Sequence, residues 1–404
     1  MGGVSMEWKE VRLGEVADVQ TGPFGSQLHK ENYVNKGTPI VTVEHLGNKW
    51  FTSQNLPMVS DEDKLRLAKY CSQEGDVIFS RVGSVDRCSY VSKEYSGWLF
   101  SGRCLRVRPR SGINPEYLYY FLTNEGTKQY IRNIAVGATM PSINTKLLNE
   151  VPITIPSLDD QHRIASILSS LDRKIELNNK INADLEEMAQ AIFKNWFVDF
   201  EPFKDGKFVD SELGMIPEGW KVGTLADIAE ITMGQSPAGN SLNENREGMI
   251  FYQGSSDFGF RFPSIRVFTT EPKRLAVANS VLFSVRAPVG DINVAKEECC
   301  IGRGVASIKS KYGHDSYLFY TMKSLHKLFD SFDGEGTVFG SINKKTLSAI
   351  QILLPSDGIV EQFNNIASSF DDRIRSLSDE NSRLSLLRDT LLPRLMSGEL
   401  EVPE

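Results

Sequence analysis

The chain contains 404 residues, with a formal net charge of −7 and five cysteines. This length exceeds what one hydrophobic core normally holds, so two or more domains are predicted. No stretch approaches the ~20 apolar residues of a membrane-spanning helix, and nothing near the start resembles a signal peptide. The odd number of cysteines, without a Cys-x-x-Cys pair, disfavours a disulfide framework or a zinc site and predicts a cytoplasmic protein. Met6 stays open as an alternative start to Met1.

The first globular part is expected over residues 1–155. Short β-rich runs alternate there with glycine turns, at residues 39–43, 76–80 and 104–108. A helix is expected from Pro115 to Tyr130, with Asn114 as its N-cap and Pro115 in its first turn. The proline-bounded segment 151–156 then reads as an extended exit strand.

A long helix is predicted over residues 156–197, and a second copy of it over residues 355–396. The two stretches align without a gap at an offset of 199 residues, and Ser157-Leu158-Asp159-Asp160 resembles a capping box at the start of the first. Each stretch carries apolar residues at alternating steps of four and three, which is typical of a coiled coil. At ~1.5 Å per residue each helix would be roughly 60 Å long, and the other copy is the obvious partner of that length.

The predicted contact line of this coiled coil, here called the seam, recurs at matched positions in the two copies. In the first copy it consists of Ile164, Leu168, Leu171, Ile175, Asn178, Asn182, Leu185, Ala189, Ile192 and Trp196. In the second copy it consists of Phe363, Ala367, Phe370, Ile374, Leu377, Asn381, Leu384, Arg388, Leu391 and Leu395. Asn182 and Asn381 interrupt the seam at matched places, where paired amides can fix the register. Two amphipathic helices on separate globular cores remain the alternative.

A polar linker is expected over residues 204–219, followed by a second globular part over residues 220–354 that repeats the plan of the first. The recurring segments include Phe79-Ser80 with Phe283-Ser284, Gly102-Arg103 with Gly302-Arg303, Tyr117-Leu118-Tyr119-Tyr120 with Tyr317-Leu318-Phe319-Tyr320, and Ser142-Ile143-Asn144 with Ser341-Ile342-Asn343. The intervening loops differ in polar content, for example residues 27–32 and 240–246. A shared scaffold with divergent loops is what two parts that recognise different ligands would show.

The predicted fold class is therefore α/β (α+β). Two mixed, mostly β domains are joined by two long helices that form an antiparallel coiled coil, and the chain has an internal pseudo-twofold repeat. The expected segments are 1–155, 156–203, 204–219, 220–354 and 355–404.

The acidic excess is unevenly distributed along the chain. Residues 1–155 and 220–355 each carry a net charge of +2, and the remainder carries −11. The two globular parts are thus weakly basic, which permits DNA binding without proving it.

Motifs of catalysis are missing or incomplete. Asn114-Pro115-Glu116-Tyr117 nearly spells the Asn-Pro-Pro-Tyr loop of adenine-N6 methyltransferases, but it lacks the second proline and is interpreted as a helix start. No phosphate-binding Gly-x-x-x-x-Gly-Lys loop or adenosylmethionine-binding glycine turn is present. Glu62-Asp63-Lys64 matches a nuclease-like pattern but lies in a polar run, and the histidines have no metal-ligand spacing. These observations favour a non-catalytic protein.

Polar residues of the loops and strands are the candidates for DNA contacts. Arg106, Arg108 and Arg110 alternate along a strand, so they share one face and could contact phosphate, although an exposed strand face would show the same pattern. Arg81 and Arg286 lie in matching glycine-containing loops, where an arginine can pair with guanine, bind phosphate or simply pair with a surface acid. The full set of candidates is Gln27, His45, Asn48, Lys49, Arg81, Ser84, Arg106, Arg108, Thr139, Gln253, Ser255, Ser256, Arg261, Arg286 and Thr337.

The chain resembles the specificity subunit of type I restriction-modification systems, over essentially its whole length. The resemblance is carried by four segments: 141–144 leading to the exit strand, 193–202, 214–220 and 391–400. It implies two target recognition domains, each recognising half of a bipartite, asymmetric site in double-stranded DNA. It also implies that the paired helices dock two methylation subunits. One departure from the first copy is Pro393, which stands where that copy has Lys194 and should kink or end the second helix.

By the same resemblance, this chain binds no cofactor of its own and no membrane. S-adenosylmethionine would belong to the methylation subunits, and ATP and Mg to restriction subunits that join through the assembled complex. A single-chain adenine-N6 DNA methyltransferase is the alternative function, and a coiled-coil scaffold that never touches DNA is a third.

The repeat also predicts how half of the chain would behave. A fragment of residues 1–205 would expose its whole seam, and a self-complementary seam can be buried in a twofold homodimer. From the apolar pattern alone, such a fragment is expected to dimerise.

Overall fold

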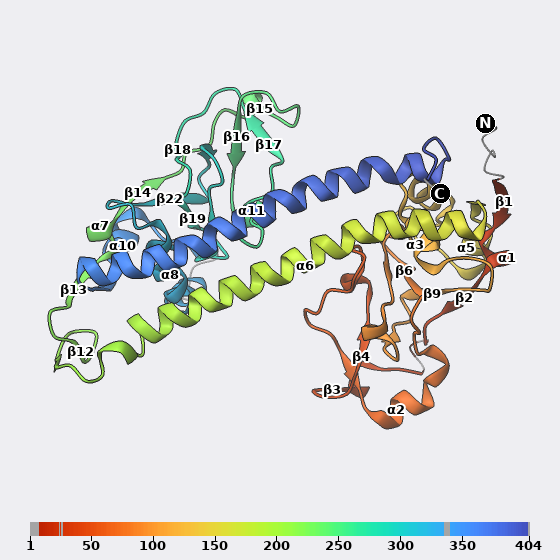
Figure 1. The fold of residues 1–404 in the computed structure, drawn as a ribbon, viewed down its shortest axis with the longest axis horizontal. Coiled ribbons are helices and arrows are strands. Elements are labelled where there is room, and N and C mark those ends of the chain that lie inside the picture. The colour runs from red at the N-terminus through yellow and green to blue at the C-terminus, as the bar shows by residue number, and fades with distance from the viewer. Residues whose placement is uncertain (1–7, 24, 26, 335–339, 403–404) are drawn as a thin grey trace. The chain divides into compact units, whose positions relative to one another are not determined.

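The computed structural model describes residues 8–23, 25, 27–334 and 340–402, and Figure 1 draws it as a ribbon. Met1, Met6 and Thr337, which were singled out above, lie outside these residues. The chain divides into two compact units: unit 1 comprises residues 1–177 and 380–404, and unit 2 comprises residues 178–379. Each unit takes part of both long helices, and the segment bounds expected from the sequence stay a prediction.

Two sheets and a ribbon make up the strands described in unit 1. The central sheet has the order β2-β9-β6-β7 and is antiparallel throughout, with strands β2 (Ala17–Thr21), β9 (Cys104–Pro109), β6 (Val77–Ser80) and β7 (Cys88–Tyr90). The outer sheet has the order β3-β5-β4-β8, with strands β3 (Tyr33–Val34), β5 (Met58–Val59), β4 (Thr38–Val41) and β8 (Leu99–Phe100), of which β4 and β8 are parallel. β1 (Lys9–Arg12) pairs antiparallel with β10 (Pro152–Ile155), which is the expected exit strand.

The short helices of unit 1 are α1 (Leu13–Val16), α2 (Asp61–Arg66), α3 (Pro115–Thr123), α4 (Glu125–Ile134) and α5 (Thr145–Asn149). The single helix expected over residues 115–130 is wrong in this detail, because Asn124 has extended backbone angles and separates α3 from α4. The N-cap prediction is confirmed, since the Asn114 Oδ1 atom accepts a hydrogen bond of 2.9 Å from the Tyr117 backbone nitrogen. Asn114-Pro115-Glu116-Tyr117 is therefore a helix start.

Unit 2 repeats this arrangement of strands. Its central sheet has the order β14-β22-β19-β20, with strands β14 (Ala229–Met233), β22 (Val305–Ser310), β19 (Val281–Ser284) and β20 (Ile292–Val294). Its outer sheet has the order β15-β17-β16-β21-β18, with strands β15 (Leu242–Asn243), β17 (Val267–Thr269), β16 (Met249–Tyr252), β21 (Cys299–Ile301) and β18 (Leu275–Ala276), of which β16 and β21 are parallel. β13 (Lys221–Thr224) pairs with β23 (Gln351–Leu354), and β11 (Phe208–Val209) pairs with β12 (Ile216–Pro217).

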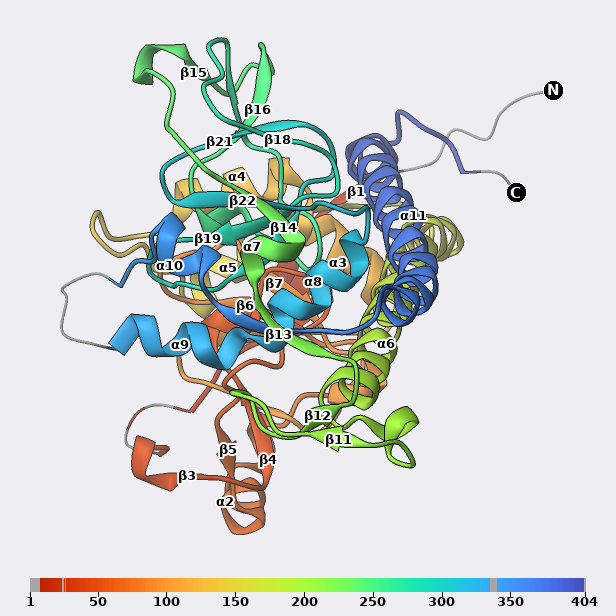
Figure 2. The same ribbon diagram turned by 90° about the vertical axis from the view of Figure 1, so that its left-hand side faces the viewer.

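The short helices of unit 2 are α7 (Leu225–Ile228), α8 (Asp315–Ser324), α9 (His326–Gly334) and α10 (Lys344–Ser348). Figure 2 shows α8 between the central sheet and the long helices. Its ring contacts agree with that position, because Tyr317 packs against Phe193 and Phe363 with ring centroids 6.0 and 6.3 Å away. One apolar core thus joins sheet, α8 and long helices in this unit.

Matched glycines show how closely the two scaffolds agree. Gly22 follows β2 and Gly234 follows β14, and each lies against a carbonyl oxygen of the turn before the neighbouring strand. A Cβ atom added at Gly22 would lie 2.2 Å from the Ser101 oxygen, and one at Gly234 would lie 2.1 Å from the Gly302 oxygen. Only glycine allows that approach, so the repeat extends to the backbone of the strand ends.

The two long helices are α6 (Leu158–Phe197) and α11 (Asp357–Met396), each beginning two residues later than expected and ending where expected. Ser157 caps α6, because its Oγ atom accepts a hydrogen bond of 3.2 Å from the Asp160 nitrogen. Of the two outcomes expected at Pro393, a kink or an end of the helix, the end does not occur, since α11 continues to Met396. Pro393 has no N–H to bond the Asp389 carbonyl, so one intrahelical bond is lost there, and only three residues of the helix follow it.

The helices pair in antiparallel fashion within each unit. In unit 1, Asp172 of α6 bonds Arg388 of α11, and Lys174 lies 3.6 Å from Glu380. In unit 2, the Phe193 and Phe363 rings lie 5.5 Å apart. Every seam position predicted from the sequence is buried or half-buried. This pairing and the mixed, mostly β units confirm the predicted fold class.

Among the described residues, no helix is long and apolar enough to cross a membrane. All five cysteines are free, and burial raises the pKa of Cys88 to about 12.

Candidate nucleic-acid interface

The loops that follow β6 and β19 are the first candidate contact surface, and their backbones match residue by residue. Arg81 O accepts a hydrogen bond from Ile143 N, as Val285 O does from Ile342 N, at 2.9 and 3.1 Å. At the next position, Val82 forms an antiparallel backbone β-bridge with Ser142, and Arg286 forms the same kind of bridge with Ser341. Arg286 is therefore the counterpart of Val82, and Arg81 is the counterpart of Val285.

The two arginines consequently differ in environment. Val285 is buried, and Arg81 in the same position is half-buried, with its Nη1 atom donating a hydrogen bond of 3.3 Å to the Gly102 carbonyl. The Arg286 side chain is exposed, and no described residue bonds it. Arg286 is therefore the better placed of the pair for an outside ligand.

Of the three alternating arginines of β9 and its end, Arg110 is exposed and pairs with Asp18, while Arg106 and Arg108 are turned to other protein groups. Arg106 is 7% exposed and donates to the carbonyls of Lys69 and Cys71. Arg108 makes two hydrogen bonds of 2.7 Å with Asp76. Both guanidinium groups bind protein atoms, and phosphate contact by Arg106 and Arg108 stays a prediction.

Lys49 is likewise buried and does not face solvent. It is 6% exposed, and its Nζ atom lies 2.8 Å from Glu116 Oε1 and 2.9 Å from the Tyr120 hydroxyl. Asp172 of α6 completes this cluster at 3.9 Å and also accepts a hydrogen bond from Tyr120. Burial lowers the pKa of Lys49, while Glu116 and Asp172 favour its charged form. Lys49 therefore connects the outer sheet of unit 1 to α3 and α6.

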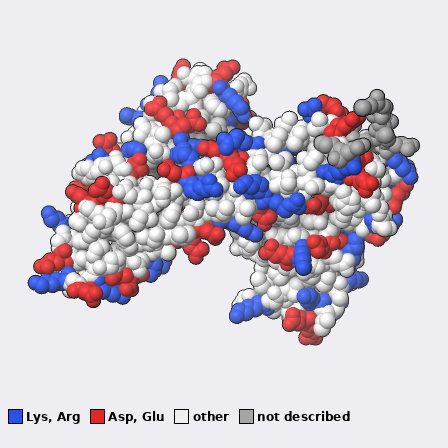
Figure 3. Space-filling view, in the orientation of Figure 1, with Lys and Arg blue, Asp and Glu red and all other residues white. Residues whose placement is uncertain are grey.

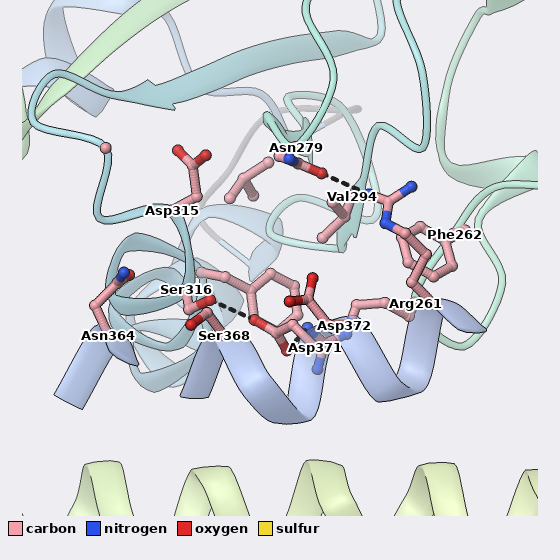
Figure 4. A pocket seen from close by; sticks show the side chains of 14 residues that line it. Arg261, Phe262, Asn279, Val294, Asp315, Ser316, Asn364, Ser368, Asp371 and Asp372 are labelled. Carbon is pink, nitrogen blue, oxygen red and sulfur yellow. Dashed lines mark hydrogen bonds and ion pairs between the residues drawn. The ribbon is translucent and has the colours of Figure 1, made fainter. Parts of the chain in front are cut away.

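Arg261 is the corresponding buried cation of unit 2. It is 3% exposed, its Nη1 atom lies 2.6 Å from Asp371 Oδ1, and its Nη2 atom bonds Glu186 and the Tyr320 hydroxyl. Figure 4 shows Asp371 on α11, where it also accepts a hydrogen bond of 2.6 Å from the Ser316 hydroxyl. Neither Arg261 nor Lys49 is retained as a DNA contact.

His45 is also internal, at 1% exposed, and its Nε2 atom lies 2.9 Å from the Gln54 carbonyl. The remaining candidates lie at or near the surface. Asn48, Ser84, Thr139, Gln253 and Ser256 are exposed, while Gln27 and Ser255 are half-buried. Gln27 accepts a hydrogen bond from Tyr70 and Gln253 from Ser236, which positions both amides.

Sequence reasoning missed the carboxylates and tyrosines that hold Lys49 and Arg261. The signal was available, since Tyr120 and Tyr320, and Asp172 and Asp371, occupy matched positions of the repeat. No group of three or more potential metal ligands occurs in the described part of the chain. Lys and Arg are interspersed with Asp and Glu over the face drawn in Figure 3.

Two units built on one scaffold, with differing polar loops and paired long helices, define the class of protein as an internally duplicated α/β protein. A family model described as Type I restriction modification DNA specificity domain matches residues 6–187 and 217–385. The chain therefore belongs to the family of type I restriction-modification DNA specificity subunits, as the sequence resemblance implied. Its role is DNA sequence specificity within such a complex, and it is a non-catalytic subunit.

Individual relatives agree with this family. The chain is 32% identical to the putative type I restriction enzyme MjaX specificity subunit of Methanocaldococcus jannaschii, over 100% of this chain and 96% of the relative. It is 26% identical to the type I restriction enzyme HindI specificity subunit of Haemophilus influenzae, over 98% and 100%. A crystal structure of the type I restriction-modification S subunit from M. genitalium is similar in fold, with a TM-score of 0.60, 16% identity and coverage of 100% and 98%.

Proposed function

We propose that the chain recognises a bipartite, asymmetric site in duplex DNA, with unit 1 contacting one half and unit 2 the other. The observation that carries this proposal is the contrast between scaffold and loops. Sheet order, matched glycines and loop hydrogen bonds repeat, whereas Arg286 replaces Val82 at one position of the contact loop. Two equivalent frames with different polar surfaces favour two different half-sites.

The surface contacts are proposed to come from the exposed and half-buried candidates. In unit 1 these are Gln27, Asn48, Arg81, Ser84 and Thr139. In unit 2 they are Gln253, Ser255, Ser256 and Arg286. Thr337 remains a sequence-based candidate outside the described residues.

The long helices are proposed to dock two methylation subunits, one against each unit. Met188 of α6 and Leu387 of α11 occupy matched positions of the repeat and are 51% and 46% exposed. Two apolar side chains at equivalent exposed places suit two copies of one partner. S-adenosylmethionine would be bound by those subunits, and ATP and Mg by restriction subunits that join the complex.

Selection from random duplex DNA tests the recognition proposal. The chain assembled with its methylation subunits is expected to enrich one site with two unlike halves separated by an unspecified spacer. Alanine at Arg286 should change the preference in one half alone. Enrichment of a palindrome, or of a single uninterrupted half, would contradict the assignment of one half-site to each unit.

A further inference from the structure

Lys49 and Arg261 occupy repeated positions, so their clusters are two versions of one site. Lys49 follows β4 and Arg261 follows β16, each after a short 3-10 turn, η2 (Val43–His45) and η7 (Ser255–Asp257). Each bonds the hydroxyl of a matched tyrosine at 2.9 Å, on α3 in unit 1 and on α8 in unit 2. Each also pairs with a matched aspartate of the long helix that follows its own sheets.

The second long helix of each pair contributes a different charge to each cluster. In unit 1, α11 supplies Arg388, whose Nη1 atom lies 2.7 Å from Asp172 Oδ1. In unit 2, α6 supplies Glu186, which bonds both Arg261 and Lys323. Glu186 is 5% exposed, so its charge depends on these partners.

The repeat alignment shows what stands at the same turn of the opposite helix. At the offset of 199 residues, Glu186 corresponds to Ser385, and Ala189 corresponds to Arg388. At this turn α6 therefore carries an acid and a methyl group, whereas α11 carries a hydroxyl and a guanidinium. Both units need the residues that the opposite helix brings.

In the folded chain, the cations and carboxylates of each cluster balance. In unit 1, Lys49 and Arg388 accompany Asp172 and Glu116. Two exposed residues lie at the rim with opposite charges: Arg173, 4.0 Å from Glu116, and Asp389, 2.8 Å from Arg388. In unit 2, Arg261 and Lys323 accompany Glu186 and Asp371. Each cluster thus has two internal cations and two carboxylates.

Self-pairing of either helix in the same register would upset that balance. If α6 paired with a second α6, Ala189 would replace Arg388 and Glu186 would approach Asp172, leaving Lys49 with an additional carboxylate. If α11 paired with a second α11, Arg388 would approach Asp371, which Arg261 already neutralises. A buried charge without its partner is strongly destabilising.

We propose that these charges make the two long helices selective for each other, so that a first-half segment pairs with a second-half segment and not with another copy of itself. This inference rests on the helix pairing and not on the proposed function. It predicts the opposite of the expectation that a fragment of residues 1–205 dimerises, because that expectation did not include the charged residues beside the seam.

The test uses the full chain with a protease site inserted between Asp205 and Gly206, which are exposed. The folded protein is cleaved, dissociated in urea, reassembled by dilution and analysed by native mass spectrometry. A first-half pair is a complex of two first halves, and a mixed pair contains one first half and one second half. Random pairing would give about one first-half pair for every two mixed pairs. Selective pairing is expected to reduce first-half pairs by roughly a hundredfold relative to mixed pairs. First-half pairs at their random share would overturn the proposal.

An exchange of the charges between the helices sharpens the test. The variant Glu186→Ser, Ala189→Arg, Ser385→Glu and Arg388→Ala keeps the composition and net charge of the chain. Each half would then carry the residues that its own aspartate cluster needs from a partner. The cleaved variant is therefore expected to form mainly pairs of two first halves and pairs of two second halves. Retention of mixed pairs as the main species would contradict the assignment to these residues.

Exposed matched positions provide the control. Asp184 of α6 and Arg383 of α11 are related by the same offset and are both exposed. The exchange Asp184→Arg with Arg383→Asp moves charge between the helices outside the clusters, so mixed pairs should persist. An equal shift to self-pairs in this control would show that general helix charge, and not the buried clusters, decides pairing.

Discussion

At the scale of single residues, the lysines and arginines fall into two groups. Some are buried and bond other parts of the protein, and others have exposed side chains that can contact a ligand. Lys49, Arg106 and Arg261 are each less than a tenth exposed and bond protein oxygen atoms. Their burial is a tertiary property, and nothing in the neighbouring residues distinguishes them from surface cations. Arg286 has the opposite character, because its backbone is fixed by the bridge to Ser341 while its side chain stays exposed.

We therefore expect Arg286→Ala to weaken DNA binding more than Arg81→Ala does. A bidentate contact with guanine predicts a loss of about 1–3 kcal/mol at one base pair, whereas a phosphate contact predicts a uniform loss and a shallower salt dependence. Fluorescence anisotropy over a salt series distinguishes these outcomes. Lys221→Ala, an exposed cation on β13, serves as the control. Unchanged affinity in Arg286→Ala would remove this loop from the interface.

At the level of elements, the long helices were the most predictable part of the fold. A repeat with a 3.5-residue mean step, sustained from Ile164 to Trp196 and again from Phe363 to Leu395, is a strong local signal, and together with the ungapped alignment it located both helices within two residues. The break at Asn124 was missed because Asn is compatible with both a helix interior and a cap. The offset of one residue between Arg81 and Arg286 was missed because Phe-Ser precedes both loops and hides the extra residue.

The cluster around Glu186 predicts a specific dependence on pH. Burial favours its neutral form, but Arg261 and Lys323 outweigh this and hold the pKa of Glu186 below its ordinary value of 4.5. A lowered folded-state pKa stabilises the protein above pH 4.5, and this contribution is lost as the pH falls below 4.5 through the folded value. The Gln190 amide, which also bonds Glu186, does not titrate.

Glu186→Gln should consequently cost up to about 3–5 kcal/mol of unfolding free energy at neutral pH. The difference from the unsubstituted chain should shrink as the pH falls below 4.5, the ordinary pKa of this carboxyl group. Denaturant unfolding at several pH values measures both effects. Glu187→Gln, at an exposed neighbouring position, should change little. A pH-independent difference would show that Glu186 is not charged in the folded state.

At the level of the whole molecule, each unit has its own apolar core. The main core of unit 1 combines its central sheet with Ile164 and Leu168 of α6 and Leu395 of α11. That of unit 2 combines its own sheet with Phe193 of α6 and Phe363 of α11. The sequence repeat predicted two equivalent domains, but it could not show that a unit takes its helices from both copies, because that depends on which segments pack together.

Separate cores predict separate responses to substitution. Lys49→Met should destabilise unit 1 by about 3–5 kcal/mol, because Asp172 and Glu116 lose their buried cation, and Arg261→Met should have a similar effect on unit 2. Hydrogen exchange measured by mass spectrometry should show the loss of protection in the peptides of the substituted unit alone. Lys36→Met, at an exposed position, is the control. Equal loss of protection throughout the chain would indicate that the two cores unfold together.

The charges of buried Glu186 and half-buried Arg388 also have a consequence for recombination between related genes. A genetic crossover within the region that encodes residues 204–219 would give a descendant a first half from one parent and a second half from another. The new loops of that descendant could differ freely, since they face solvent. The charged residues of its helices could not differ freely. The second half must supply a cation that pairs with Asp172, and the first half must supply an acid that pairs with Arg261 and Lys323. Under the proposed helix selectivity, these charged residues would limit which combinations of DNA specificity can arise by recombination.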